Sequence, residues 1–109
     1  MKKTIICAFA LLAAGVLAVR GADAKELWTK NCLKCHGEDG KGKTKMGEKL
    51  NIKDYTDPKV QNELKDDAMA KAIKEGVKKD DATKMKAFGE ILSDDEIKAL
   101  VAYVRGLKK

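Results

Sequence analysis

The chain has 109 residues, with 23 basic and 17 acidic side chains that give a formal net charge of +6. This length fits a single domain. Basic and acidic residues are interleaved, without a basic stripe or a nucleic-acid-binding motif, so nucleic acid is excluded as the expected partner.

The first 24 residues have the pattern of a secretory signal peptide. Lys2 and Lys3 form a basic start, residues 5–19 are almost wholly apolar, and residues 22–24 (Ala-Asp-Ala) match an A-x-A cleavage site. The apolar run is shorter than the roughly 20 residues that a membrane-spanning helix needs. We therefore expect cleavage after Ala24, a periplasmic location, and no permanent membrane anchor.

Removal of the leader would leave one domain of 85 residues, 25–109, with a net charge of +4. At this size an apolar core alone contributes only a few kcal/mol to stability. A first helix is predicted from residue 25 to about residue 34. Glu26 lies in its first turn, where a carboxylate interacts favourably with the helix dipole. Trp28 and Cys32 are four positions apart and share one side of this helix.

The pentapeptide Cys32-Leu33-Lys34-Cys35-His36 holds two of the three cysteines and the only histidine. Two thiols three positions apart, followed directly by an imidazole, have the spacing that attaches a c-type haem. A thioredoxin-like redox pair would lie between a strand and a helix, and no strand pattern appears here. A structural zinc site usually has four Cys or His ligands, and residues 25–109 offer three. Haem attachment is the preferred interpretation, with thiol redox chemistry and zinc binding as alternatives.

This motif, near the start of a small exported chain, resembles the class I, single-haem cytochromes c of the small soluble bacterial type. The resemblance implies an all-α fold in which three to five short helices surround one covalently attached haem c per chain, with the N- and C-terminal helices crossing. It implies that Cys32 and Cys35 form thioethers with the haem, that His36 is the proximal axial ligand, and that a distant methionine is the distal ligand. In the family, an aromatic residue at the position of Trp28 packs against the C-terminal helix.

Residues 37–42 are glycine-rich and predict a sharp turn after His36. Residues 47–50 (Gly-Glu-Lys-Leu) then resemble the family's Gly-Pro-x-Leu segment, in which the proline carbonyl accepts a hydrogen bond from the proximal histidine ring. Glu48 replaces that proline, so the loop loses a fixed φ angle. By the same resemblance, Leu50 is expected to contact the haem, with an ordinary core position as the alternative.

Two helices are predicted in the middle of the chain. The Asp-Pro pair at 57–58 supplies an N-cap and a first helical residue, opening a short helix through about residue 64. A second helix is predicted from residue 66 or 67 to residue 75, with Gly76 as its C-cap. Met69 lies on the apolar face of this helix and is expected in the core.

The segment from 77 to 92 shows no periodicity, and such a long structureless stretch inside a compact domain is usually functional. Its residues 83–88 resemble the family's Met-Pro-x-Phe loop, with Lys86 in place of the proline. Met85 is therefore predicted as the distal iron ligand. It follows His36 by 49 residues, which is enough chain to reach the opposite face of a haem.

Two other arrangements at the distal position stay open. Met46 lies only ten residues after His36, in a segment expected on the proximal side, and it is the alternative methionine. An open site or a site with a lysine ligand is the other alternative.

The final helix has the clearest local signal. Residues 93–96 (Ser-Asp-Asp-Glu) form a capping box, and apolar residues recur behind it at helical spacing. We expect Trp28 to pack against Leu100 and Tyr103 of this helix.

The function implied is electron transfer by a monomeric, non-enzymatic carrier, because a haem with two protein axial ligands has no open coordination site. Lys34, Lys84 and Lys86 flank the expected haem residues and would attract acidic redox partner proteins, or they form an ordinary solvated surface. Two other functions remain open. One is a haem sensor or small peroxidase-like enzyme in which Met85 dissociates, and the other is a fixed electron-entry subunit of an oxidoreductase.

Overall fold

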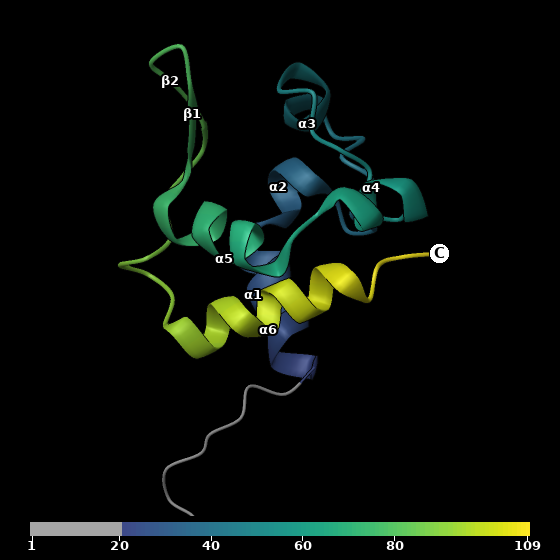
Figure 1. Cartoon of the computed structure of the whole chain (residues 1–109), viewed down its shortest axis with the longest axis vertical. Helices are drawn as coiled ribbons and strands as arrows, with labels where there is room; N and C mark the ends of the chain where they lie inside the picture. Colours follow the sequence, from purple (N-terminus) through teal and green to yellow (C-terminus); the bar gives the residue numbers. More distant parts are fainter. Residues whose placement is uncertain (1–20) are drawn as a thin grey trace, which may run out of the picture.

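The computed structural model describes residues 21–109, so most of the predicted signal peptide lies outside the described residues. In this part of the chain, six helices are accompanied by one two-stranded hairpin (Figure 1). In chain order the elements are α1 (Gly21–Asn31), α2 (Leu33–His36), α3 (Lys45–Lys49), α4 (Pro58–Glu63), α5 (Asp66–Glu75), β1 (Val77–Lys79), β2 (Ala82–Met85) and α6 (Asp94–Arg105).

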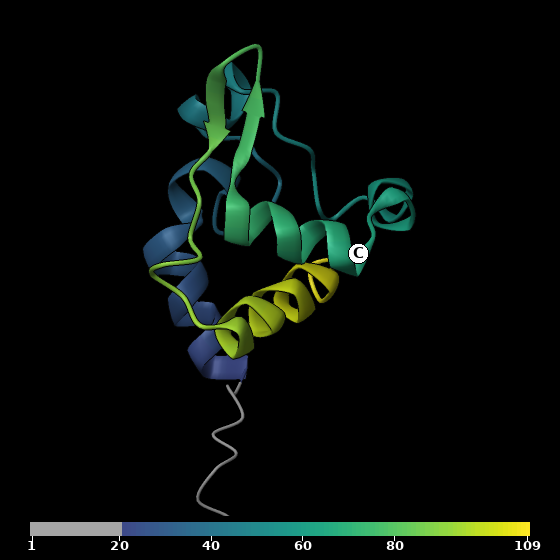
Figure 2. The ribbon, with the colours of Figure 1, turned by 60° about the vertical axis from the view of Figure 1, so that its left-hand side comes forward.

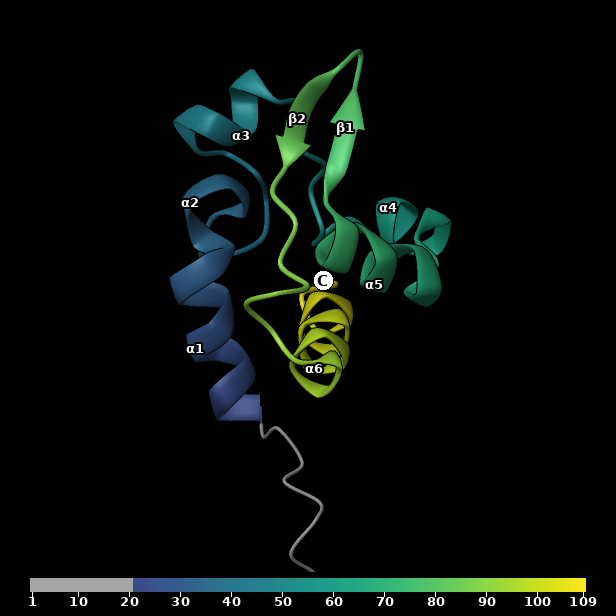
Figure 3. The same ribbon diagram turned by 90° about the vertical axis from the view of Figure 1, so that its left-hand side faces the viewer.

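The first and last helices cross, as expected from the sequence, and α5 lies alongside α6 (Figures 1 and 3). Trp28 on α1 is 2% exposed, and its ring centroid lies 5.3 Å from that of Tyr103 on α6. Leu100 is 1% exposed and belongs to the same core cluster as Trp28. This confirms the predicted packing between the two ends of the chain.

The capping signals are also confirmed. Ser93 Oγ accepts from the Glu96 N–H at 3.1 Å, and Glu96 Oε1 accepts from the Ser93 N–H at 2.9 Å, which completes the capping box of α6. The Asp57 carboxylate accepts from the Lys59 N–H at the start of α4. Helix α5 ends at the predicted C-cap, Gly76.

The predicted first helix differs in its bounds. It begins at residue 21 and is interrupted at Cys32, so that the pentapeptide forms a separate turn of helix, α2. This interruption brings the number of helices in the described residues to six, above the expected three to five. The glycines at 37, 40 and 42 all have positive φ, as a sharp turn after α2 requires.

The hairpin corrects the prediction that residues 77–92 lack regular structure and that the chain has no strands. Strands β1 and β2 pair antiparallel, with Lys79 opposite Ala82, and Asp80 and Asp81 between them have φ of 53° and 64°. Aspartate is one of the few residues that adopt this left-handed conformation. The strands carry no alternating apolar pattern, because nearly every residue in them is exposed. For this reason the strands could not be recognised from the sequence.

The hairpin and α3 project at the same end of the molecule, away from the crossed helices (Figures 2 and 3). Among residues 21–109, no helix has both the length and the apolar character needed to cross a bilayer.

Candidate functional site

Two adjoining cavities open between the crossed helices and the projecting end. The inner one measures about 220 Å³ and the outer one about 400 Å³. They share four wall residues, which are Cys32, His36, Tyr55 and Met85. Their combined volume falls within the roughly 300–1,000 Å³ that is typical of cofactor sites. The sequence-predicted residues thus meet around one space.

Helix α2 and its N-cap residue, Cys32, present the two thiols and the imidazole of the pentapeptide to these cavities. The Cys32 carbonyl accepts from the N–H groups of Cys35 at 3.2 Å and His36 at 2.9 Å, which winds the pentapeptide into one turn. Cys32 faces both cavities and Cys35 faces the outer one, and both are free thiols. Burial, followed by the nearby Cys35, raises the pKa of the Cys32 thiol to about 11. Without a cofactor this thiol stays protonated at neutral pH.

The His36 imidazole lacks the hydrogen bond that the family resemblance implied. Its Nδ1 atom is buried and has no hydrogen-bond partner among the described residues. The Glu48 carbonyl, which was expected to accept from it, instead accepts from the Asn51 N–H at 3.3 Å. In the absence of a proline, residues 45–49 coil into α3, and this turns their carbonyls along the helix.

Two aromatic rings lie against the imidazole. The Tyr55 ring stacks on it with centroids 5.3 Å apart, and the Trp28 ring lies at 5.5 Å. Burial lowers the pKa of the His36 imidazole, so the neutral form that binds a metal is favoured. Burial also raises the pKa of the Tyr55 hydroxyl. Sequence reasoning missed Tyr55, because no local pattern marks it.

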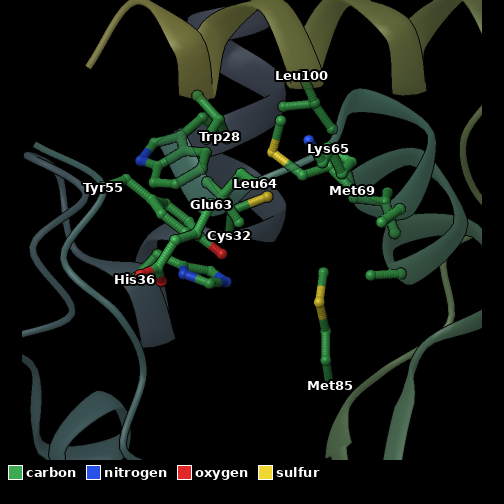
Figure 4. Close-up of a pocket in the computed structure, with 14 residues that line it drawn as sticks. Trp28, Cys32, His36, Tyr55, Glu63, Leu64, Lys65, Met69, Met85 and Leu100 are labelled. Atoms are coloured by element: carbon green, nitrogen blue, oxygen red, sulfur yellow. The ribbon is translucent and has the colours of Figure 1, made fainter. Parts of the chain in front are cut away.

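Met85 faces the same space from the other side (Figure 4). It is the last residue of β2 and pairs with Val77 across the hairpin. The chain after it returns to α5, where the Phe88 N–H donates to the Ile73 carbonyl at 2.8 Å and the Gly89 N–H donates to the Lys74 carbonyl at 3.0 Å. The end of α5 therefore fixes both ends of the segment that carries Met85.

The other methionines occupy different surroundings. Met46 is 37% exposed on α3 and lines neither of these two cavities. Met69 is 8% exposed and belongs to the core cluster, as predicted, although its side chain also lines the inner cavity. Leu50 lies in the wall of the outer cavity, where the sequence analysis expected a haem contact.

The outer cavity has a basic rim. Its wall contains four lysines and no acidic residue, and these lysines are Lys34, Lys53, Lys84 and Lys86. Lys53 adds to the three lysines singled out from the sequence. It lies in the segment after α3, outside the sequence motifs that carry the expected haem residues.

The residues present fit a covalently bound haem. Two free thiols and the His36 imidazole border one mainly apolar space, and a soft thioether lies across it. Within residues 21–109, no three His, Cys, Asp or Glu side chains gather in a group that could hold a metal ion.

Comparison with known proteins agrees with this chemistry. Residues 19–104 match the family model described as cytochrome c oxidase, cbb3-type, subunit III. Two solved structures are similar to the chain, each with a TM-score of 0.68. The KustC0563 c-type cytochrome is 33% identical and covers 79% of this chain and 98% of its own. A tyrosine-to-phenylalanine mutant of Kustc0563 is 36% identical and covers 79% of this chain and 99% of its own. No match was found among curated proteins.

Fold, site and comparisons together define a c-type cytochrome. The chain belongs to the family described as cytochrome c oxidase, cbb3-type, subunit III. It binds haem c covalently and acts in electron transfer as a carrier rather than as an enzyme. The predicted fold class, cofactor and general function are thereby confirmed, and the thiol redox and zinc interpretations of the pentapeptide are set aside.

Proposed function

We propose that Cys32 and Cys35 form the thioethers to the haem and that His36 and Met85 are its axial ligands. The observation that supports this is the placement of an imidazole and a thioether on opposite sides of the space shared by two cavities. The haem supplies one-electron redox chemistry. A thioether ligand favours the ferrous state and raises the reduction potential relative to two imidazoles.

The protein contributes shape and exclusion of water. Ala68, Ala72 and Ile73 of α5 line the inner cavity without offering a polar side chain. An apolar wall disfavours the additional positive charge of the ferric state. An apolar wall on this side and the proposed Met85 ligand both favour electron transfer over substrate binding at this site.

Carbon monoxide tests this ligation. The visible spectrum of the reduced wild-type protein is expected to stay unchanged when the gas is added, because both axial positions are filled. Met85→Ala should open the iron and shift the Soret band on addition of the gas. Met46→Ala is the matched control and should behave as the wild type, since Met46 lines neither cavity.

Other results would lead to a different conclusion. A Soret shift in the wild type would favour the sensor or peroxidase-like function with a dissociable Met85. A Met85→Ala protein that resembles the wild type would show that another residue is the distal ligand.

We further propose that the carrier exchanges electrons with exported or membrane redox proteins that present an acidic face to Lys34, Lys53, Lys84 and Lys86. The basic rim of the outer cavity supports this, since opposite charges raise the rate of encounter. The family description names an oxidase subunit, which makes an oxidase one candidate partner and leaves a fixed subunit role as the alternative to a free carrier.

Small redox reagents of opposite charge test the rim without an identified partner. Oxidation by anionic hexacyanoferrate(III) should slow as salt is added, because salt screens the attraction. Oxidation by cationic tris(phenanthroline)cobalt(III) should accelerate with salt. The double variant Lys84→Glu, Lys86→Glu should weaken both trends. Lys59→Glu, at an exposed position of α4 that lines neither cavity, serves as the control. Rates independent of salt for both reagents would contradict the proposal.

A periplasmic location after cleavage at Ala24 is also proposed. Cleavage there would remove the first four residues of α1 and leave a helix starting at Lys25. The intact mass of the protein from a periplasmic fraction should match residues 25–109 plus one haem. A mass that includes residues 1–24 would show that the leader is retained.

A further inference from the structure

The proximal imidazole is placed by rings rather than by a hydrogen bond. Histidine ligands usually donate their second ring N–H to an acceptor, which fixes the plane of the ring. In this structure the Nδ1 atom of His36 is buried without a hydrogen-bond partner among the described residues, and the Glu48 carbonyl accepts from the Asn51 N–H rather than from His36. Contacts other than a hydrogen bond at Nδ1 must therefore hold the orientation of this ring.

We propose that Trp28 and Tyr55 form an aromatic bracket that fixes the plane of the His36 imidazole. The Tyr55 ring stacks on the imidazole at a centroid distance of 5.3 Å and an interplanar angle of 22°. The Trp28 ring contacts it at 5.5 Å and 41°. Figure 4 shows the three rings together on one side of the cavity. The inference rests on the proposed ligation by His36.

The Trp28 arm of the bracket is fixed at two points. Its indole Nε1–H donates to the Gly37 carbonyl at 2.9 Å, a buried hydrogen bond that joins α1 to the turn after α2. Its ring also lies 5.3 Å from the Tyr103 ring on α6. Rotation of Trp28 would break both contacts, so the position of this ring beside the imidazole is fixed.

The Tyr55 arm is held through its backbone. The Tyr55 N–H donates to the Gly40 carbonyl at 2.9 Å, and the Tyr55 carbonyl accepts from Gln61 Nε2 at 2.6 Å. The same Gln61 amide donates to the Val104 carbonyl of α6 at 2.8 Å. Gln61 is 3% exposed, so losing these bonds would leave buried polar groups unsatisfied.

Both arms of the bracket therefore end on α6, Trp28 through Tyr103 and Tyr55 through Gln61. Gln61 is in turn held by Arg105, whose guanidinium donates to the Gln61 side-chain oxygen at 3.1 Å. The final helix thus acts as the support of the proximal ligand.

The bracket has two consequences for the site. The plane of an axial imidazole decides how its π system overlaps with the iron orbitals, and so how unpaired electron density spreads over the porphyrin. An imidazole whose Nδ1–H lacks an acceptor is also a less basic ligand for iron than one whose Nδ1–H is hydrogen-bonded. Tyr55 and Gln61 are accordingly positioning residues, and the contact that matters is the ring face of Tyr55 rather than its hydroxyl.

The test compares Tyr55→Phe with Tyr55→Leu in the ferric holoprotein. The readout is the spread of the four haem-methyl hyperfine shifts in proton NMR, which reports the plane of the axial ligands. Tyr55→Phe keeps the ring and should retain the wild-type pattern. Tyr55→Leu removes it and should change the order or the spread of the four shifts.

Gln61→Met keeps the side-chain volume but removes both amide donors, and it should shift the pattern in the direction of Tyr55→Leu. This second variant decides the question if Tyr55→Leu does not fold. A wild-type pattern in Tyr55→Leu, or in a folded Gln61→Met when Tyr55→Leu is lost, would overturn the bracket. Equal changes in Tyr55→Phe and Tyr55→Leu would also overturn it, because the hydroxyl would then be responsible.

The visible spectrum of each variant separates this inference from the ligation on which it rests. A low-spin, six-coordinate spectrum shows that both axial positions remain filled, so a change in the hyperfine pattern then reports the orientation of the ligands rather than the loss of one. If His36→Ala kept the wild-type low-spin spectrum, the proposed ligation would fail, and that result is independent of the Tyr55 variants.

Discussion

Gly47 illustrates how closely the backbone is packed behind the site. A Cβ atom at this position would collide with the carbonyl oxygens of Gly42 and Cys35, which are backbone atoms and cannot move aside cheaply. The Thr44 hydroxyl reinforces this contact, since it donates to the Cys35 carbonyl at 2.7 Å and accepts from the Gly47 N–H at 2.8 Å. Helix α3 is in this way fixed to the back of α2.

Gly47→Ala is therefore expected to lower the free energy of unfolding of the holoprotein by about 2–3 kcal/mol, because the loop and α2 must separate. Gly106 is the matched control. It has φ of −72°, and the nearest atom to an added Cβ lies 3.4 Å away, so Gly106→Ala should stabilise by about 0.4–1 kcal/mol. Denaturant titration measures both, and equal effects would contradict the prediction.

Asp54 gives the protein an acid-sensitive contact. Its carboxylate accepts from the Thr56 hydroxyl at 2.6 Å and from the Thr56 N–H at 2.8 Å. These bonds, the side-chain bond first, lower the pKa of Asp54 below its ordinary 3.8. A lowered pKa in the folded state adds stability that is fully present above the unfolded pKa and is lost as pH falls through the folded pKa.

The stability difference between the wild type and Asp54→Asn should accordingly be largest at neutral pH and should shrink as the pH is lowered below about 4. Free energies of unfolding at several pH values measure this difference. A difference that stays constant down to strongly acidic pH would show that the Thr56 contact does not depend on the charge of Asp54.

The residues proposed to bind and position the cofactor were unequally visible in the sequence. Cys32, Cys35 and His36 form a contiguous motif, so the sequence was sufficient to predict their meeting point. Tyr55 and Gln61 act through contacts that span the chain, such as the bond from Gln61 to Val104, 43 residues away. No local pattern encodes a contact of that range.

Among the elements, α6 depends on its own N-terminus for part of its stability. The reciprocal bonds between Ser93 and Glu96 satisfy two backbone N–H groups that would otherwise lack a partner. Ser93→Ala is expected to cost about 1 kcal/mol. Lys98→Ala, an exposed change in the same helix, should change stability by less than about 0.5 kcal/mol. Thermal unfolding of the holoproteins compares them, and a larger loss in Lys98→Ala would contradict this role of the cap.

The hairpin carries a local strain that a better turn sequence would relieve. Asp80 and Asp81 both have positive φ, a combination for which Asn-Gly is preferred. Replacing the pair by Asp80→Asn and Asp81→Gly should slow amide hydrogen exchange in β1 and β2 relative to the wild type. Asp80→Ala should accelerate it, because alanine adopts this conformation less readily. Unchanged exchange rates in both variants would show that the turn does not limit opening of the hairpin.

The helices could be predicted from the sequence and the hairpin could not, because only the helices have local sequence signals. The capping box, the Asp57-Pro58 pair and the cap at Gly76 are each encoded within a few residues, and the helices that they delimit were predicted. The hairpin depends on two aspartates in a rare conformation and on strands exposed on both faces. Neither feature leaves a hydrophobic period, so the strands escaped prediction.

For the molecule as a whole, the stability of the fold depends on whether the space inside the core is filled. Core residues from α1, α5, α6 and the turn between α1 and α2 line the inner cavity, so the core surrounds the space for the cofactor. These residues are Trp28, Cys32, Met69, Ile73, Leu100 and Val104. A small domain with such a space unfilled loses much of the packing that would stabilise it. We predict that the haem-free protein is unfolded or molten.

The double variant Cys32→Ala, Cys35→Ala, prepared without haem, tests this prediction. It should show no cooperative thermal transition in near-UV circular dichroism, whereas the haem-bound wild type should unfold cooperatively. The wild-type chain without haem and with blocked thiols should behave as the double variant does. A sharp transition in either haem-free protein would show that the polypeptide folds without its cofactor.

The distance along the chain between the two proposed axial ligands couples folding to electron transfer. His36 ends α2, and Met85 ends β2, 49 residues later. Binding of both to one iron would close that length of chain into a loop. Unfolding would then release the distant Met85 more readily than His36, which directly follows the proposed thioether at Cys35. In a thermodynamic cycle, the reduction potential of the folded protein minus that of the unfolded chain then equals, in energy units, the extra stability of the reduced form. Because the proposed thioether ligation would raise the potential of the folded protein, each electron received would stabilise the fold and each electron passed on would destabilise it.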